Sequence, residues 1–396
     1  MMKLLVLVSS LDLSQPFSAT PAWWQLLKGL YEIGVEVIAA PYQGPAIDSL
    51  WWRAEANPAR WQGKAFKSAR DFSRALRPKP DVDDSTASAG DSLSDIAVRA
   101  TAQKLIAPLW RDHLAGILRR EDDISAILFI TVPLNHLRGV PGYLSRTFDV
   151  PVLFYDGDVP ASLPHMQGFA SGFRMYQGAD LSEYAAFISN SRGGEDLLRQ
   201  LGAAHAHTLW YGADPDVFRP VAVPAQDIDL LFYGHGREYR EDWIDSMITA
   251  PASQLRDYRF AVRGNNLGDL GAVKKLPYLS FSKLREYICR SKLNLCITRG
   301  AHASVYASSS SRPFELGALG ACIVANPYAG IEEWFEPKKE LIIVNSADEA
   351  RDHYEFLLRN DTARQAIGKA ARERVLKQHT FRHRASELVG IISQYI

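Results

Sequence analysis

The chain is poor in cysteine and has no surplus of charge of either sign. Its 396 residues include three cysteines, Cys289, Cys296 and Cys322, whose spacing matches neither a disulfide framework nor a zinc site. Lysine plus arginine and aspartate plus glutamate both number 45, so no basic excess indicates nucleic acid as a partner. These absences predict reduced core thiols and a partner that is not a polyanion.

Long hydrophobic runs are also missing. The N-terminal run Leu4–Val8 follows a single Lys3 and is too short for the apolar core of a signal peptide. No later stretch reaches the ~18 apolar residues of a membrane-spanning helix. We therefore expect a cytoplasmic protein without a transmembrane segment, whose contact with a membrane is at most peripheral.

The length and the periodicity predict two domains. A chain of 396 residues exceeds the ~250–300 residues at which single cores usually stop growing. Short apolar strands alternate with amphipathic helices, such as one long helix over 96–120, and the alternation restarts after the segment 220–224. We expect an α/β fold of two Rossmann-like doubly wound domains facing a central cleft. The first spans 1–221 with an irregular insertion at 41–95, the second spans 222–379, and a helix over 380–396 packs back on the first.

A serine-rich segment precedes one short helix of the second half. The run Ser308–Ser311 can cap this helix, Pro313 suits its first turn, and Glu315 lies near its positive end. Free backbone N–H groups, hydroxyls and Arg312 at a helix start favour binding of a diphosphate. The alternative is an ordinary capped helix on the surface.

Several short motifs occur in an order that resembles a known enzyme family. They are Tyr211-Gly212-Ala213-Asp214, Arg312-Pro313-Phe314-Glu315, Gly320-Ala321 and His379-Thr380-Phe381. Together they resemble the two-Rossmann (GT-B) glycosyltransferases of group 1, and the CgeB-type (spore maturation protein-like) branch in particular. The resemblance covers residues 187–395. It implies a hexosyltransferase-type glycosyltransferase that moves a sugar from a nucleotide-diphosphate sugar to a hydroxyl of a glycan, lipid, protein or small molecule.

The resemblance also implies a donor site in the second domain. Glu315 is expected to accept hydrogen bonds from the ribose, while Ser310, Ser311 and Arg312 hold the diphosphate and Phe314 adds a further donor contact. Arginines at strand ends neutralise the phosphates in place of a metal, and the donor is of the UDP, dTDP or GDP type, with no tightly bound cofactor. The remaining donor-site candidates are Gly236, Arg237, Gly264, Asn265, Tyr278, Leu279 and Arg299, with Arg240 as a rival for the role of Arg237.

The first domain offers the base that an inverting transfer needs. The candidates are Asp158, Asp156, His165 and Asp12. Two nearby carboxylates can separate their pKa values, so that one stays a competent base. Asp156-Gly157-Asp158 is otherwise a turn, or the metal motif of the single-domain (GT-A) enzymes. Retaining members of the family carry a glutamate where this chain has Ala307, which favours inversion.

Three other functions stay open at this point. A nucleotide-sugar epimerase of the same fold would release a changed sugar nucleotide without any acceptor. A non-catalytic relative would bind the nucleotide sugar alone. An unrelated two-domain α/β binding protein would carry a signal peptide, which the sequence given does not show.

Overall fold

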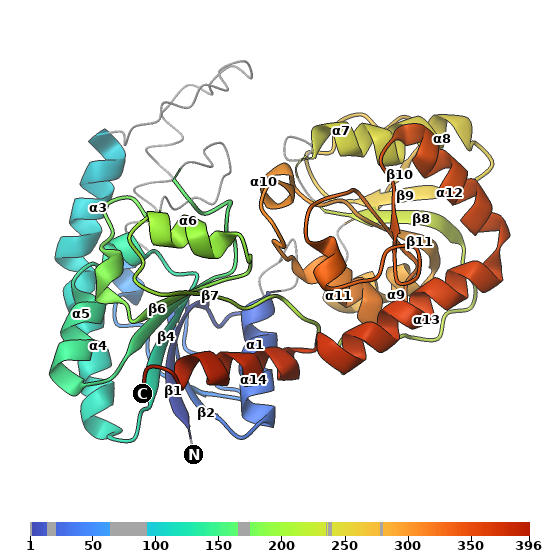
Figure 1. Cartoon of the computed structure of the whole chain (residues 1–396). Coiled ribbons are helices and arrows are strands. Elements are labelled where there is room, and N and C mark those ends of the chain that lie inside the picture. The colour runs from blue at the N-terminus through green and yellow to red at the C-terminus, as the bar shows by residue number, and fades with distance from the viewer. Residues whose placement is uncertain are drawn as a thin grey trace. The chain divides into compact units, whose positions relative to one another are not determined.

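The computed structural model describes residues 2–13, 21–63, 93–164, 175–234, 236, 240–277 and 280–396. Contacts divide the chain into two compact units. Unit 1 comprises Met1–Ser14, Leu30–Leu209 and Ser386–Ile396, and unit 2 comprises Gln15–Gly29 and Trp210–Ala385. Each unit holds one parallel β-sheet, which confirms the expected pair of α/β domains (Figure 1). The expected boundary between residues 221 and 222 stays a prediction.

The sheet of unit 1 has seven strands in the described part of the chain, in the order β3-β2-β1-β4-β5-β6-β7. Every neighbouring pair is parallel. The apolar run Leu4–Val8 forms most of β1, an interior strand, and is fully buried, as a parallel strand covered on both faces requires. The strands are β1 (Lys3–Ser10), β2 (Glu36–Gln43), β3 (Arg53–Ala54), β4 (Ala126–Ile130), β5 (Val152–Asp156), β6 (Ala186–Ser189) and β7 (Ala206–Thr208).

Helices of unit 1 cover one face of this sheet with a continuous apolar core. They are α3 (Leu93–Leu105), α4 (Ala107–Arg120), η1 (Leu134–Leu137), α5 (Val140–Phe148), η2 (Leu181–Glu183) and α6 (Gly194–Gln200). The single helix expected over 96–120 is wrong, because the chain breaks into α3 and α4 at Ile106. Pro108 lies in the first turn of α4 and has no N–H to continue the preceding helix.

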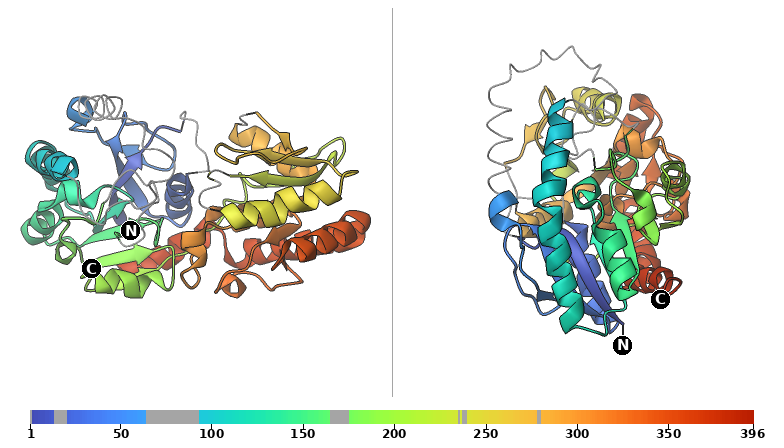
Figure 2. Two further views of the ribbon diagram at one scale, coloured as in Figure 1. Left: turned by 90° about the horizontal axis from the view of Figure 1, so that it is seen from above. Right: turned by 90° about the vertical axis from the view of Figure 1, so that its left-hand side faces the viewer.

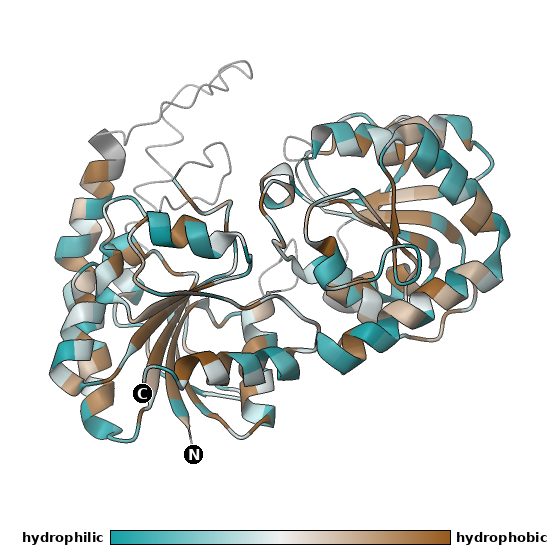
Figure 3. Ribbon diagram, in the orientation of Figure 1, coloured by the Kyte–Doolittle hydropathy of each residue, from teal (hydrophilic) through white to brown (hydrophobic). Residues whose placement is uncertain are grey.

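The sheet of unit 2 has six parallel strands in the described residues, in the order β10-β9-β8-β11-β12-β13. They are β8 (Ile228–Tyr233), β9 (Phe260–Arg263), β10 (Lys274–Lys275), β11 (Ser291–Cys296), β12 (Ile323–Ala325) and β13 (Ile342–Ile343). Successive side chains of β8 enter opposite cores, with Leu231 and Tyr233 on one face and Leu230 and Phe232 on the other. The apolar character of these strands is visible in Figure 3.

Helices lie on both faces of the second sheet (Figures 1 and 2). Those within unit 2 are α7 (Glu241–Ile244), the π-helical η4 (Asp245–Thr249), α8 (Ala250–Gln254), α9 (Phe281–Cys289), α10 (Gly300–Ala303), α11 (Ser311–Ala318), η5 (Ile331–Glu333), α12 (Ala347–Arg359) and α13 (Asp361–Gln378). Two helices, α1 (Ala22–Glu32) and α14 (Phe381–Ile392), are divided between the units. Among the described helices, none is both long and apolar enough to cross a membrane.

Strand order reverses once in each sheet. In unit 1 the reversal lies between β1 and β4, and in unit 2 it lies between β8 and β11. At such a point the loops leaving the carboxyl ends of the two strands diverge to opposite faces, which opens room for a ligand. The segments that follow these four strands are therefore the places where this fold is expected to bind ligands.

An ion-pair network closes the opposite, amino-terminal end of β1. Lys3 Nζ lies 2.9 Å from Glu121 Oε2 and 2.8 Å from Asp123 Oδ1, and Arg53 Nη2 lies 2.5 Å from Glu121 Oε1. Hydrogen bonds from Arg53 and then Lys3 lower the pKa of Glu121 to about 2. Because the pKa of Glu121 is lower in the folded chain than in the unfolded chain, the ionised carboxylate stabilises the fold at pH values above about 4.5. This stabilisation is lost as the pH falls towards 2.

We predict that Glu121→Gln lowers the melting temperature near neutral pH, because it removes the carboxylate that both cations share. The difference from wild type should shrink steadily between about pH 5 and pH 2, since protonation removes the same charge from the wild-type chain. Circular dichroism melts at several pH values measure this. Asp122→Asn is the matched control, because Asp122 is exposed and adjacent. A difference that stays constant over this pH range contradicts the prediction.

Candidate functional site

The backbones at the ends of β8 and β9 are pressed together. A Cβ atom placed on Gly264 would lie 1.6 Å from the carbonyl oxygen of Gly234, so no side chain fits at position 264. Backbone hydrogen bonds hold this arrangement, from Gly234 N to Arg263 O at 2.9 Å and from Gly236 N to Asn265 O at 3.2 Å. The expected glycine-lined border of the donor site is thus a close contact between two backbones, with no room for a side chain at position 264.

Arg312, in the first turn of α11, lies over the strand ends at the reversal point of unit 2. Its Nη1 donates to the carbonyl of Ile297, just after β11, at 3.4 Å, and its Cζ lies 4.8 Å from the centre of the Tyr233 ring at the end of β8. The buried Nε has no hydrogen-bond partner among the described atoms. A guanidinium has five N–H donors, so Arg312 retains capacity to bind an anion.

A second guanidinium meets the same carbonyl. Arg240 Nε donates to Ile297 O at 2.8 Å, so Arg240 and Arg312 converge on the end of β11. Both cations act to lower the pKa of the neighbouring Cys296 thiol, although burial is the larger effect and raises it. This edge of the sheet is therefore cationic, as a site for phosphate requires.

Glu315 lies one turn further along α11, on the same side of the helix as Arg312. Burial first, and then the charge of Glu315, raise the pKa of Tyr233 above its usual range, so the carboxylate is close to that ring. Glu315 is only 3% exposed. The role expected for it, accepting hydrogen bonds from a ribose, requires the surroundings of α11 to admit the sugar.

The serine run divides into two pairs with different roles. Ser309 Oγ accepts a hydrogen bond from Tyr211 N at 3.0 Å, and Ser308 Oγ lies 2.8 Å from His302 Nδ1. Both are buried, so they hold loops in place. Ser310 and Ser311 are half-buried at the start of α11, and no side-chain cap from Ser310 is found in the described structure. The second pair thus remains at the helix end where an anion can bind.

Two other sequence-based candidates, Phe314 and Arg299, have contacts of their own in the structure, and four lie outside the described residues. Phe314 is fully buried among Trp334, Phe335 and His379, with ring centres 5.3 to 5.8 Å away, so the structure gives it a packing role, and its donor contact stays a prediction. Arg299 Nη2 contacts His302 Nε2 at 2.5 Å, within the loop network around Ser308. The candidates that lie outside the described residues are Arg237, Tyr278, Leu279 and His165.

Asn326 is a polar residue of this edge that sequence reasoning missed. It follows β12, its Oδ1 accepts a hydrogen bond from Thr298 N at 2.7 Å, and it is fully buried. Its Nδ2 has no partner among the described atoms. A polar residue directly after an apolar strand was the available signal, because the carboxyl ends of parallel strands gather at one edge.

Two of the motifs that carried the resemblance pack on each other. Ala213 N donates to His379 O at 3.0 Å, Phe381 N donates to Ala213 O at 3.1 Å, and Arg384 Nε donates to Tyr211 O at 2.9 Å. A Cβ on Gly212 would lie 2.8 Å from His379 O. The two motifs therefore have a structural role, because the segment around Gly212 packs against the segment that leads into α14.

In unit 1 the two aspartates at the end of β5, Asp156 within the strand and Asp158 just after it, differ sharply in environment. Asp156 is fully buried, and its carboxylate accepts hydrogen bonds from Ser162 Oγ at 2.5 Å, Tyr176 Oη at 2.7 Å and Asp158 N at 2.9 Å. Burial raises the pKa of Asp156, and these hydrogen bonds oppose the rise. A carboxylate with this many donors holds its loop together, and the expected role of Asp156 as a base stays a prediction. Asp158 is half-buried.

The reversal point of unit 1 adds two further groups. Asp12, half-buried, follows β1, and its N–H is bonded to Ser10 Oγ at 3.1 Å. Thr131 follows β4 and ties it to the loop of Asp158, since Gly157 N donates to Thr131 Oγ1 at 3.3 Å. Asp12 and Asp158 therefore lie on the same carboxyl edge of this sheet.

Sequence reasoning missed His136, in η1 directly after β4. Its Nδ1 lies 3.0 Å from the hydroxyl of Tyr42, near the carboxyl end of β2. Burial, with a smaller effect from Arg99, lowers the pKa of His136 to about 4, so the imidazole is neutral near pH 7. A lone histidine among apolar residues gives no signal of this pairing, because Tyr42 is distant in the sequence.

Comparison with known proteins connects this fold with sugar transfer. Residues 237–390 match a family model described as "Glycosyl transferase-like". No curated protein sequence matches the chain.

Solved structures with the same two-domain fold cover nearly the whole chain at low identity. Sucrose-phosphate synthase from Thermosynechococcus elongatus is 15% identical with a TM-score of 0.64, covering 99% of this chain and 98% of its own. The trehalose-6-phosphate synthase OtsA is 14% identical with a TM-score of 0.66, covering 100% and 99%. Anabaena HepE in complex with UDP-glucose is 12% identical with a TM-score of 0.60, covering 100% of both chains. The fold is thus the GT-B fold of these proteins.

We predict that Gly264→Ala strongly destabilises the protein, because its Cβ would overlap the carbonyl oxygen of Gly234. A backbone atom cannot move aside as a flexible side chain can, so the loss should be about 3 kcal/mol or more in the free energy of unfolding. Gly390→Ala is the control, since a Cβ there meets nothing within 4 Å and alanine favours the helix. Urea unfolding measures both. Equal stability of the two variants contradicts the close contact.

Proposed function

We propose that the protein is a glycosyltransferase that moves a sugar from a nucleotide-diphosphate sugar to an acceptor hydroxyl. The observation that carries the proposal is the Arg312 guanidinium, which lies at the strand-order reversal of unit 2 and beside the start of α11. A cation, unused N–H donors and a helix start at such a point suit a diphosphate. The family match over 237–390 includes this region.

The donor is assigned to the carboxyl edge of unit 2. Arg312 and Arg240 balance the phosphate charge, and Ser310 and Ser311 supply hydroxyl and backbone donors at the start of α11. Glu315 accepts hydrogen bonds from the ribose hydroxyls, and the nucleobase lies beside the backbones of Gly236, Gly264 and Asn265. Anabaena HepE has been solved with UDP-glucose and with UDP, which makes a UDP-sugar the first donor to test.

The chemical step assigned to the chain is inverting. The acceptor oxygen attacks the anomeric carbon, the bond from that carbon to the phosphate oxygen breaks, and the acceptor proton passes to a base. We assign the general base to Asp158, because the carboxylate of Asp156 already accepts three hydrogen bonds within its own loop. Asp12 is the alternative base on the same sheet edge. The leaving diphosphate is stabilised by Arg312 and the helix start in place of a metal ion.

The surroundings of Ala307, where retaining members of the family carry a glutamate, support an inverting mechanism. Ala307 is fully buried with a left-handed φ of 48°, and its carbonyl accepts a hydrogen bond from Trp210 Nε1 at 3.2 Å. A Cβ on the neighbouring Gly330 would lie 2.3 Å from Ala307 N, so no room exists for a longer side chain on that side. A carboxylate at this position would lie in the core, away from a sugar.

We predict that Arg312→Ala weakens UDP binding by about ten- to a hundredfold, since a lost charge-assisted hydrogen bond costs about 1.5–3 kcal/mol. Glu315→Gln should weaken it by a similar factor, because the amide cannot accept from two ribose hydroxyls as a carboxylate does. Calorimetric titration with UDP, GDP, dTDP and CMP measures this. Arg259→Ala is the control, an exposed arginine at the amino edge of the same sheet. Unchanged affinity in both site variants would overturn the donor assignment.

The next prediction distinguishes the catalytic role proposed for Asp158 from the structural role of Asp156. Asp158→Asn should lower the turnover number by about 10²–10⁴-fold while UDP affinity and melting temperature stay near wild type. Asp156→Ala should instead lower the stability by about 1–3 kcal/mol, because it leaves buried donors without an acceptor.

Transfer is measured with a UDP-sugar in the presence and absence of EDTA. Loss of activity with EDTA and its recovery with Mn²⁺ contradict the metal-free mechanism. Full turnover in Asp158→Asn moves the base to Asp12 or His165. Release of an altered sugar nucleotide without an acceptor would identify an epimerase, and nucleotide binding without any turnover a non-catalytic relative.

A further inference from the structure

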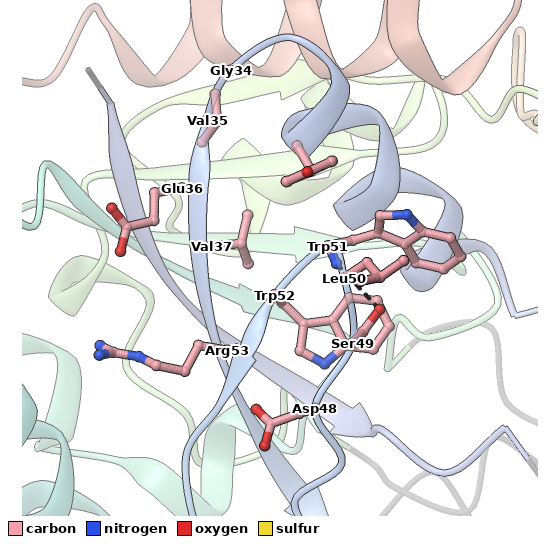
Figure 4. Close-up of a pocket in the computed structure, with 11 residues that line it drawn as sticks. Gly34, Val35, Glu36, Val37, Asp48, Ser49, Leu50, Trp51, Trp52 and Arg53 are labelled. Carbon is pink, nitrogen blue, oxygen red and sulfur yellow. Dashed lines mark hydrogen bonds between the residues drawn. The ribbon is translucent and has the colours of Figure 1, made fainter.

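A pocket of about 540 Å³ lies at the edge of the sheet of unit 1, away from the carboxyl ends of its strands. It is formed by the end of α1, the first residues of β2 and the loop that leads into β3 (Figure 4). Its volume falls in the range of small-molecule sites, ~300–1,000 Å³. Neither the donor site nor the acceptor base uses any residue of this pocket.

Aromatic side chains form one part of the wall. Trp51 is half-buried, with its ring centre 5.9 Å from that of Trp52. Tyr31 is 53% exposed and Leu50 is 86% exposed. Such large apolar surfaces are seldom left in water unless something covers them, and here they are gathered in one concavity.

Charged groups form the rest of the rim. Figure 4 shows Glu36 and Arg53 on the side opposite Trp51, with Asp48 below them. Asp48 Oδ1 accepts one hydrogen bond, from Ala54 N at 2.7 Å, and a carboxylate has about four acceptor sites. Arg53 also binds Glu121, and Glu36 lies 3.4 Å from Lys3, but a guanidinium has five N–H donors and a carboxylate about four acceptor sites. The pocket therefore combines flat apolar faces with acceptors and donors for hydroxyl groups.

The loop that carries Trp51 is rigidly held. Trp52 Nε1 donates to Ile47 O at 2.9 Å, Ser49 N donates to Trp52 O at 3.2 Å, and Trp51 N donates to Ser49 Oγ at 3.2 Å. These bonds hold the backbone of the loop and the ring of Trp52 in place before any ligand arrives. A site organised in advance loses little conformational entropy on binding.

We propose that this pocket is a non-catalytic binding site for a neutral saccharide. The C–H face of a pyranose stacks on Trp51, with Tyr31 as a second platform, while ring hydroxyls donate to Asp48 and Glu36 and accept from Arg53. The two carboxylates disfavour an anionic lipid surface, which would require a basic rim. The choice of a saccharide rests in part on the proposed function, because a second binding site for the same glycan raises the overall affinity of an enzyme that extends it.

The test uses the full chain on a printed array of neutral oligosaccharides, without any nucleotide sugar. The wild type should bind at least one glycan, and both Trp51→Ala and Tyr31→Ala should weaken that binding at least tenfold. Trp61→Ala is the matched control, because Trp61 is 76% exposed in the same part of the sequence but does not line the pocket. Trp51→Phe should recover part of the binding, which separates stacking from loss of fold.

Three outcomes overturn the inference. They are the absence of binding to any glycan, an equal loss in Trp51→Ala and Trp61→Ala, and Trp51-dependent sedimentation with phosphatidylcholine–phosphatidylglycerol vesicles in place of glycan binding. UDP titration of the same variants separates this inference from the proposed function. Wild-type binding of glycans without binding of UDP would refute the donor site alone, and the reverse would refute the saccharide pocket alone.

Discussion

The contact between Gly264 and the carbonyl oxygen of Gly234 constrains the candidate donor site. Two parallel strands leave the sheet side by side there, and their backbones approach so closely that only hydrogen fits as a side chain. This approach fixes the end of β8, over which the guanidinium of Arg312 lies, with one of its nitrogens 3.1 Å from where a Cβ of Gly234 would be. The cation is thus positioned by backbone geometry more than by any ion pair.

The two sheets place opposite chemistry at their carboxyl edges. In unit 2 the loops after β8 and β11 bring Arg240 and Arg312 onto one carbonyl, which creates a cationic edge in a chain with no net charge. In unit 1 the loops after β1 and β5 carry Asp12 and Asp158. A chain with no net charge thus carries two arginines at the carboxyl edge of one sheet and two aspartates at the carboxyl edge of the other.

Burial decides which of two similar residues can take part in chemistry. Asp156 and Asp158 are two residues apart, yet the first is fully buried and accepts from Ser162 Oγ and Tyr176 Oη, whereas the second is half-buried. The serine run shows the same division, with Ser308 and Ser309 holding loops and Ser310 and Ser311 at the helix start. In both cases a step of one or two residues along the chain separates a structural group from a candidate ligand.

The sequence by itself determined the fold class. Short apolar runs such as Leu4–Val8 and the restart of the strand and helix alternation after residue 224 predicted two α/β domains, because hydrophobic periodicity is a local property. It also directed attention to Arg312 and Glu315, whose spacing on one helix is local as well. The break between α3 and α4 was predictable in principle from Pro108 but was hidden by continuous apolar spacing.

Only the tertiary structure decided which side chains meet. The convergence of Arg240 and Arg312 joins residues 72 positions apart in the chain, and the pairing of Tyr42 with His136 joins residues separated by 94. The enclosure of Phe314 depends on Trp334, Phe335 and His379, which no periodicity connects with it. Strand order brings such residues together, and strand order follows from how the whole sheet buries its faces, which no local stretch of sequence encodes.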